Sequence, residues 1–109
     1  MGVSRGDLAI AAAPGDYGKP RPVLILQSDK FHETASVIVA LITTDQRPSA
    51  ALFRKAILPS DQNGLREASD VMLDKLVTFP RSKIKKVIGH LPSTEMAEIN
   101  AALALLLGI

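Results

Sequence analysis

Apolar residues along most of the chain form short runs that proline, glycine and polar residues separate, which is typical of β-strands joined by turns. The first run surrounds Leu8 and Ile10, and five others follow at 23–27, 36–44, 53–58, 69–79 and 83–88. Residues 23–26 are all aliphatic, so this strand is predicted to be buried on both faces. We therefore expect six short strands before any helix.

The spacing of the apolar positions changes near the C-terminus. Helical intervals of three or four residues separate Met96, Ile99, Leu103 and Leu106. Ser93 suits the N-cap of this helix, and Gly108 stands where the helix would end. Strands followed by one helix predict a mainly β fold, a small and strongly bent antiparallel sheet or barrel with the helix packed against it.

Size and composition narrow the class of protein. A chain of 109 residues predicts one domain that spans residues 1–109. The absence of cysteine excludes disulfides, thiol nucleophiles and cysteine zinc sites, and it favours a reducing, cytoplasmic location. The apolar stretches 8–13 and 103–109 are too short for a signal core or a membrane span. A net charge of +2 permits nucleic-acid binding without requiring it.

Arg21 is the first candidate for chemistry, because it lies between Pro20 and Pro22 at the start of a buried strand. Proline fixes its own φ angle and holds the preceding residue in an extended conformation. The guanidinium is therefore aimed before any ligand arrives, and its planar fork suits phosphate. A solvated surface charge is the alternative interpretation.

Thr43 and Thr44 close the strand predicted at 36–44, although β-propensity alone would explain threonines at a strand end. If this strand lies beside the strand at 23–27, Thr43 and Arg21 present a hydroxyl and a guanidinium to one phosphate. The functional interpretation therefore depends on which strands are neighbours.

Other patterns for chemistry are sparse. His32 and His90 are a weaker alternative as an acid–base pair. Without a patterned carboxylate they do not predict a metal site, and no cofactor is expected. The sequence contains no P-loop, dinucleotide-binding turn or nucleophile elbow.

Taken together, the motifs resemble those of the MazF/PemK toxins of bacterial toxin–antitoxin systems. The matching pieces, in order, are Arg5-Gly6-Asp7, Arg21-Pro22-Val23-Leu24-Ile25, Ile42-Thr43-Thr44, Gly64-Leu65-Arg66 leading into 69–76, Ile88-Gly89-His90-Leu91 and the closing Leu107-Gly108-Ile109. Their order and spacing extend over nearly all of the chain.

The resemblance implies an SH3-like barrel of the MazF/CcdB type with a C-terminal helix, usually a homodimer. It implies a metal-independent endoribonuclease that cuts single-stranded RNA, often mRNA, at short sequences, with Arg21 and Thr43 as catalytic residues. For RNA binding it implies a groove at the dimer interface lined by the loop 13–19, with Asp16, Tyr17 and Lys19, and by Ser28, Thr44, Asp74 and Lys75. The implied partner is a cognate antitoxin, whose acidic C-terminal segment occupies that groove.

The chain departs from the family pattern at two places. The loop before Arg21 is shorter than in many relatives, and Met72 stands where some relatives have a second catalytic arginine. Asp16, Tyr17 and Asp74 are therefore the candidates for the group that transfers protons, and the sequence does not decide between them. Two other functions fit the same fold: a CcdB-like toxin that binds DNA gyrase, and a catalytically degenerate barrel that only binds a partner.

Overall fold

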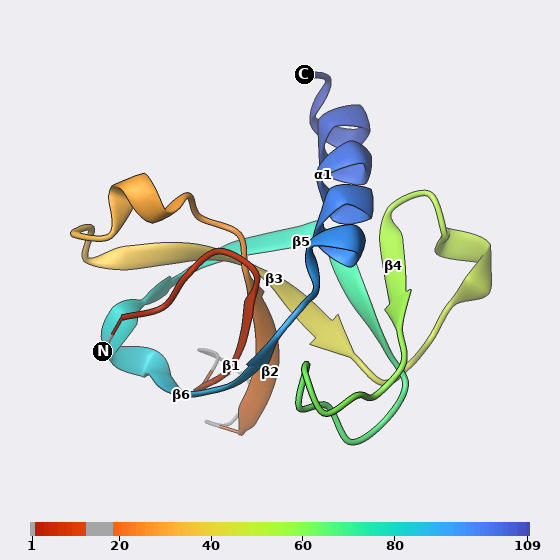
Figure 1. Cartoon of the computed structure of the whole chain (residues 1–109). Helices are drawn as coiled ribbons and strands as arrows, with labels where there is room; N and C mark the ends of the chain where they lie inside the picture. The colour runs from red at the N-terminus through yellow and green to blue at the C-terminus, as the bar shows by residue number, and fades with distance from the viewer. Residues whose placement is uncertain (1, 13–18) are drawn as a thin grey trace.

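The computed structural model describes residues 2–12 and 19–109, and these form six strands, three 3₁₀ turns and one α-helix. The strands are β1 (Asp7–Ala12), β2 (Pro20–Ile25), β3 (Ser36–Thr43), β4 (Arg54–Ile57), β5 (Ser69–Pro80) and β6 (Ile84–His90). The turns are η1 (Asp29–Phe31), η2 (Pro48–Ala50) and η3 (Arg81–Lys83), and the helix is α1 (Ser93–Leu107). The strands pair antiparallel in one bent sheet of order β4-β5-β3-β2-β1-β6, with α1 packed beside β5 (Figure 1). The mainly β class with a C-terminal helix is as the sequence predicts.

Strand β2 lies in the middle of the sheet, between β1 and β3. Its pairing with β1 continues to the start of the strand, where Ala12 lies opposite Pro20. Its pairing with β3 is shorter and ends where Val23 lies opposite Leu41. The next residue is Pro22, which has no N–H to donate to a ladder. Strands β2 and β3 therefore separate at Pro22. The exposed start of β2, which includes Arg21, pairs with β1 alone.

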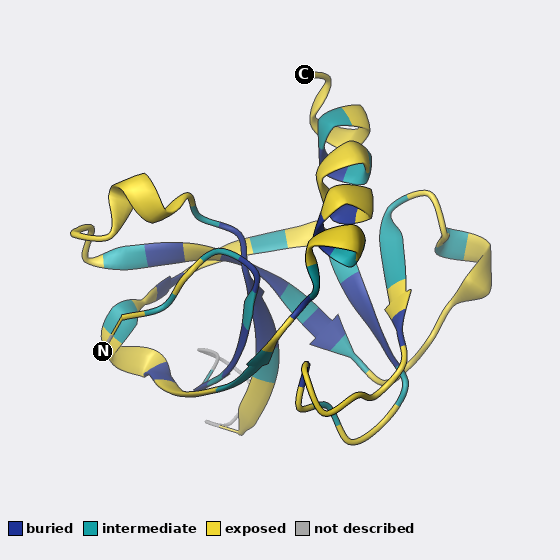
Figure 2. Cartoon of the chain, viewed as in Figure 1, coloured by how far each residue is buried: buried dark blue, intermediate teal, exposed yellow. Residues whose placement is uncertain are grey.

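Side chains alternate between the two faces of the sheet, and each face buries its own apolar cluster. One cluster joins Leu24 to Ile99 of α1, and the other joins Val23 to Phe79. The central strands are accordingly dark in Figure 2, whereas the outer side of α1 is exposed. Strand β2 is thus buried on both faces, as its aliphatic run predicts.

The C-terminal helix ends as predicted but begins differently. Gly108 has a φ angle of 76° and donates its N–H to the Ala104 carbonyl, which terminates α1. The prediction that Ser93 is the N-cap is wrong, because Ser93 is the first helical residue and Pro92 is the cap. Proline suits the extended cap conformation, and its carbonyl accepts the Met96 N–H. No helix in the described ranges has the length and hydropathy needed to cross a bilayer.

The turn before β5 packs directly on the backbone of β6. The Gln62 carbonyl accepts the His90 N–H at 2.8 Å, and a Cβ atom on Gly89 would lie only 2.3 Å from that carbonyl oxygen. Asn63 is buried beside it and donates from its side-chain nitrogen to the Leu58 carbonyl. Only glycine fits at position 89, so this turn holds the edge strand β6 in place.

We expect the Gly89→Ala variant to lower the free energy of unfolding by about 2–4 kcal/mol, because backbone atoms cannot yield as a side chain can. Urea unfolding followed by circular dichroism measures this. Gly2→Ala is the matched control, since a Cβ atom at Gly2 would meet nothing within 4 Å. Equal midpoints for both variants would contradict the close packing.

Candidate active site

Arg21 lies near the exposed start of β2, where its backbone pairs with Ala11 of β1. Pro20 and Pro22 flank it on the same strand, so the backbone on either side has little freedom. Alternation along the strand places Arg21 on the same face as Val23 and its cluster. The guanidinium is therefore presented from a rigid strand rather than from a loop.

Thr43 is the last residue of β3, and it is half-buried. The register that sets Val23 opposite Leu41 would, two residues further along, set Arg21 opposite Thr43. Ladder pairing has already ended there, so the two residues face each other across the opened end of the sheet. The strands that the sequence predicts at 23–27 and 36–44 are indeed neighbours.

Arg21 and Thr43 line the same hollow, which has a volume of about 190 Å³. Its other lining residues are Pro22, Leu41, Ile42, Met72 and Phe79. The guanidinium and the hydroxyl thus lie beside apolar lining residues. These apolar residues would exclude water from part of the space in which a phosphodiester binds. A guanidinium and a hydroxyl at such a place suit an anionic ligand.

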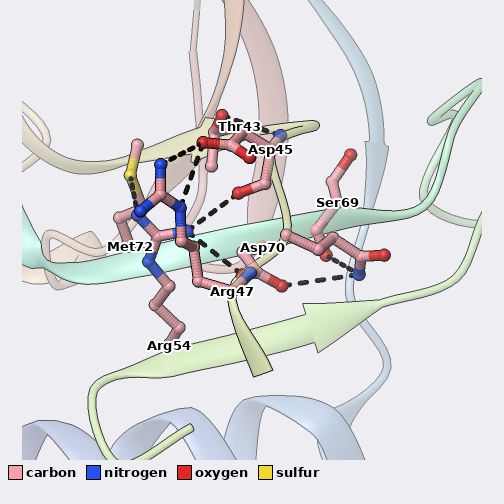
Figure 3. Close-up of polar contacts among 8 residues, drawn as sticks. Thr43, Asp45, Arg47, Arg54, Ser69, Asp70 and Met72 are labelled. Carbon is pink, nitrogen blue, oxygen red and sulfur yellow. Dashed lines mark hydrogen bonds and ion pairs between the residues drawn. The ribbon is translucent and has the colours of Figure 1, made fainter. Parts of the chain in front are cut away.

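The chain that leaves Thr43 is held by a network of polar contacts (Figure 3). The Asp45 N–H donates to the Thr43 Oγ1 at 3.1 Å, and the Arg47 guanidinium donates to the Asp45 carboxylate at 2.8 Å. Thr43 also lies opposite Asp70 in the pairing of β3 with β5. The threonine is therefore fixed both by the sheet and by the loop that follows it.

Asp70 is the centre of that network, and only 4% of its side chain is exposed. Its carboxylate accepts hydrogen bonds from the Arg47 N–H at 2.8 Å, from the Arg54 guanidinium at 3.2 Å and from the Gln46 side-chain amide at 3.4 Å. Three donors compensate a buried charge that would otherwise be costly.

The predicted RNA-binding residues do not all gather at this hollow. Lys19 is exposed directly before β2. Ser28 lies beyond the other end of β2, where its Oγ accepts the Lys30 N–H and caps η1. Asp16 and Tyr17 lie outside the described residues. Of the two described positions, Lys19 lies two residues before Arg21 in the sequence, whereas Ser28 lies seven residues after it.

Ser28 and Thr44 line two further hollows. Ser28 belongs to one of about 410 Å³, together with Phe31 and Ile38. Thr44 belongs to one of about 550 Å³, whose lining includes the charged residues Arg66, Glu67 and Lys86. Pro22 lines both the Thr44 hollow and the Arg21 hollow, so these two depressions adjoin at the end of β2.

Asp74 and Lys75 are exposed on β5, in an irregular stretch where Leu41 pairs with Met72 but Ala40 pairs with Leu76. They are not among the residues that line the Arg21 hollow. An irregularity of this kind redirects side chains locally.

The two histidines do not line that hollow either. The His32 ring contacts the Asp29 carbonyl at 3.2 Å and lies 3.9 Å from the Glu33 carboxylate. His90 ends β6, opposite Asp7. Within the described ranges, no three metal-ligating side chains gather as a group.

Sequence reasoning missed Arg54 and Asp70. Each looks like an ordinary solvated charge on a strand, yet the β4–β5 pairing brings them together in the interior. The available signal is weak: Asp70 directly precedes the apolar Val71, Met72 and Leu73, within a run otherwise suited to burial.

The chain is similar to known proteins along nearly its whole length. The model of the family described as "PemK-like, MazF-like toxin of type II toxin-antitoxin system" matches residues 4–107. A probable endoribonuclease MazF of Mycolicibacterium smegmatis is 47% identical over 106 residues, covering 96% of each chain. Endoribonuclease MazF6 of Mycobacterium tuberculosis is 32% identical over 87 residues, which cover 78% of this chain and 75% of that protein.

Solved structures agree with the sequence comparison. The M. tuberculosis toxin MazF-mt6 superposes with a TM-score of 0.81 at 26% identity, covering 94% of this chain and 97% of that one. A mycobacterial endoribonuclease in complex with its cognate antitoxin gives a TM-score of 0.81 at 27% identity, covering 98% and 96%. The barrel-like fold with a C-terminal helix is therefore confirmed. The chain belongs to the PemK-like, MazF-like toxins of type II toxin–antitoxin systems.

Proposed function

We propose that this endoribonuclease toxin cuts single-stranded RNA at specific sequences, without a metal ion, by using the 2′-hydroxyl of the RNA as the nucleophile. The observation that supports the proposal is the placement of Arg21 and Thr43 at the rim of one hollow, on the ends of neighbouring strands. RNA carries its own nucleophile, so the protein needs no cysteine and no serine triad. Its tasks are to hold the phosphate, stabilise charge and assist proton transfer.

In the reaction, the 2′-oxygen forms a bond to the adjacent phosphorus and loses its proton to a base. The bond from phosphorus to the 5′-oxygen of the next nucleotide breaks, and that oxygen takes up a proton. The products are a 2′,3′-cyclic phosphate and a 5′-hydroxyl. The phosphorane between them carries extra negative charge, and Arg21 is the group that stabilises it. One preorganised donor lowers the free energy of such a transition state by about 3 kcal/mol.

Thr43 holds a non-bridging phosphate oxygen. Its own oxygen already accepts the Asp45 N–H, which leaves the hydroxyl hydrogen to be donated to the ligand. Proton transfer falls to a further group, for which Asp16, Tyr17 and Asp74 remain the candidates. A reaction that consumes the 2′-hydroxyl also explains why RNA would be cut and DNA spared.

The partner of the toxin is a cognate antitoxin, a proposal supported by the mycobacterial structural relative that was solved with one. We expect an acidic segment of the antitoxin to approach the same cationic rim that RNA uses, since both ligands are anionic. We further propose that the toxin is a cytoplasmic, single-domain homodimer whose RNA groove lies at the dimer interface. Lys19, Thr44, Asp74 and Lys75 belong to that groove in this proposal, with Ser28 at a greater distance from Arg21.

Removing the guanidinium tests the catalytic role. We expect Arg21→Ala to lower kcat by a factor of about 10²–10³, because the lost donor acts on the transition state. The measurement is single-turnover cleavage of a fluorescent RNA, with circular dichroism to verify the fold. Lys83→Ala, which removes an exposed cation from η3, is the control and should retain full activity. A folded Arg21→Ala variant that still arrests growth would favour the gyrase-binding alternative.

Product analysis tests the chemistry. In buffer with EDTA, the purified toxin should cut a long RNA and leave 2′,3′-cyclic phosphate ends, which mass spectrometry identifies. The same substrate with one 2′-deoxy nucleotide at the cut position should stay intact at that position. RNA that survives under every condition would support the catalytically degenerate, partner-binding alternative instead.

A further inference from the structure

We infer that Arg54 and Asp70 are positioning residues for the Thr43 hydroxyl, acting through the backbone of Asp45. The inference rests on the RNA cleavage proposed above, in which Thr43 grips the phosphate. Neither charged residue lines the Arg21 hollow, so their effect must pass through other groups. The contacts that would transmit it are drawn in Figure 3.

The ion pair between Arg54 and Asp70 is largely buried, with 15% and 4% of the respective side chains exposed. The Arg54 Nη1 donates to Asp70 at 3.2 Å. The Arg54 Nε, by contrast, is buried and makes no hydrogen bond to any part of the chain that the structure describes. A pair with an unsatisfied buried donor is a poor source of stability compared with apolar residues of similar volume. Its specific geometry points to a positioning role.

The same Arg54 Nη1 also donates to the Asp45 carbonyl at 3.0 Å. Asp70 holds the next part of the loop by accepting the Arg47 N–H at 2.8 Å. The loop is therefore pinned at two backbone groups, one on each side of Gln46. The Asp45 carbonyl belongs to the peptide after Asp45 and the N–H to the peptide before it, so holding the carbonyl restrains the residue whose nitrogen lies 3.1 Å from the Thr43 Oγ1.

This contact decides what the Thr43 hydroxyl can do. A threonine hydroxyl has one hydrogen to donate and rotates freely unless its oxygen is occupied. By donating to that oxygen, the Asp45 N–H favours the orientation in which the hydroxyl hydrogen points to a ligand. The Arg54 Nη2 also donates to the Met72 sulfur at 3.4 Å, and Met72 lines the hollow. A thioether sulfur is a weak acceptor, so the contact of Arg54 that matters for the reaction is the one that acts through Asp45.

A double-mutant cycle tests the link in single-turnover cleavage of RNA. We expect Thr43→Val, which keeps the shape but removes the hydroxyl, to lower kcat about 100-fold. Arg54→Gln should lower kcat about tenfold with KM changed less than twofold, because the lost order matters in the transition state. In the Thr43→Val background, Arg54→Gln should cost nothing further. Multiplying losses in the double variant would overturn the inference.

Two further variants refine the cycle. Thr43→Ser retains the hydroxyl, so Arg54→Gln should still cost about tenfold in that background. Lys55→Gln is the matched control, because it removes a neighbouring ion pair of β4, to Glu98 of α1, without touching the loop at 44–47. It should keep kcat within twofold of the unmodified protein. A tenfold loss in Lys55→Gln would show that general destabilisation explains the effect of Arg54.

A second measurement does not depend on cleavage. Solvent exchange of the Asp45 amide, measured by NMR, should become about tenfold faster in both Thr43→Val and Arg54→Gln. It should be unchanged in Lys55→Gln. If Asp45 exchange stays slow in Arg54→Gln, the positioning link is wrong, whatever the kinetics show. If the unmodified protein cuts no RNA yet the exchange rates change as expected, the proposed function fails while the structural link stands.

Discussion

The missing N–H of Pro22 is the constraint on which the site depends. Because a proline cannot donate to a ladder, pairing of β2 with β3 ends at Val23 and Leu41. Pairing with β1 continues to Pro20, so the strand stays in the sheet while one of its sides opens. A hollow forms in that opening, with a guanidinium on one strand and a hydroxyl on the other. The positive charge that can bind an anion is thus built into the sheet itself.

The opened side needs support, because the ends of unpaired strands are otherwise free to move. Support comes from the apolar cluster beneath Arg21, where Val23 and Phe79 are almost fully buried. On the other side it comes from a charged network around Asp70. The apolar cluster supplies stability, whereas the charged network fixes the orientation of the groups that it contacts. Hydrogen bonds are directional, and dispersion contacts are not. A site that stabilises a transition state needs both, because misplacement by an ångström is costly.

How much the sequence predicts follows from how far apart the interacting residues are. Arg21 could be singled out because its constraint is local, a proline on either side. Placing Thr43 beside Arg21 requires only that the strands predicted at 23–27 and 36–44 be neighbours. The role of Arg54 and Asp70 depends on the register of β4 against β5, which no local pattern encodes. The predicted N-cap differs from the observed one by one residue, because serine and proline both suit the start of a helix and only the backbone angles show that Pro92 is the cap.

The position of Ser28 shows why a family motif does not by itself place residues around one reacting atom. Ser28 lies seven positions after Arg21 and beyond the end of β2 at Ile25, and an extended strand rises about 3.3 Å per residue, so within one protomer the two lie at most about 23 Å apart. In the proposed groove, an RNA that touches both residues of the same protomer extends past the scissile phosphate. A contact so remote binds substrate and transition state almost equally, and such binding changes KM rather than kcat. If Ser28 contacts RNA as proposed, we therefore expect it to affect affinity and sequence choice, whereas the rate depends on the groups at the opened end of β2.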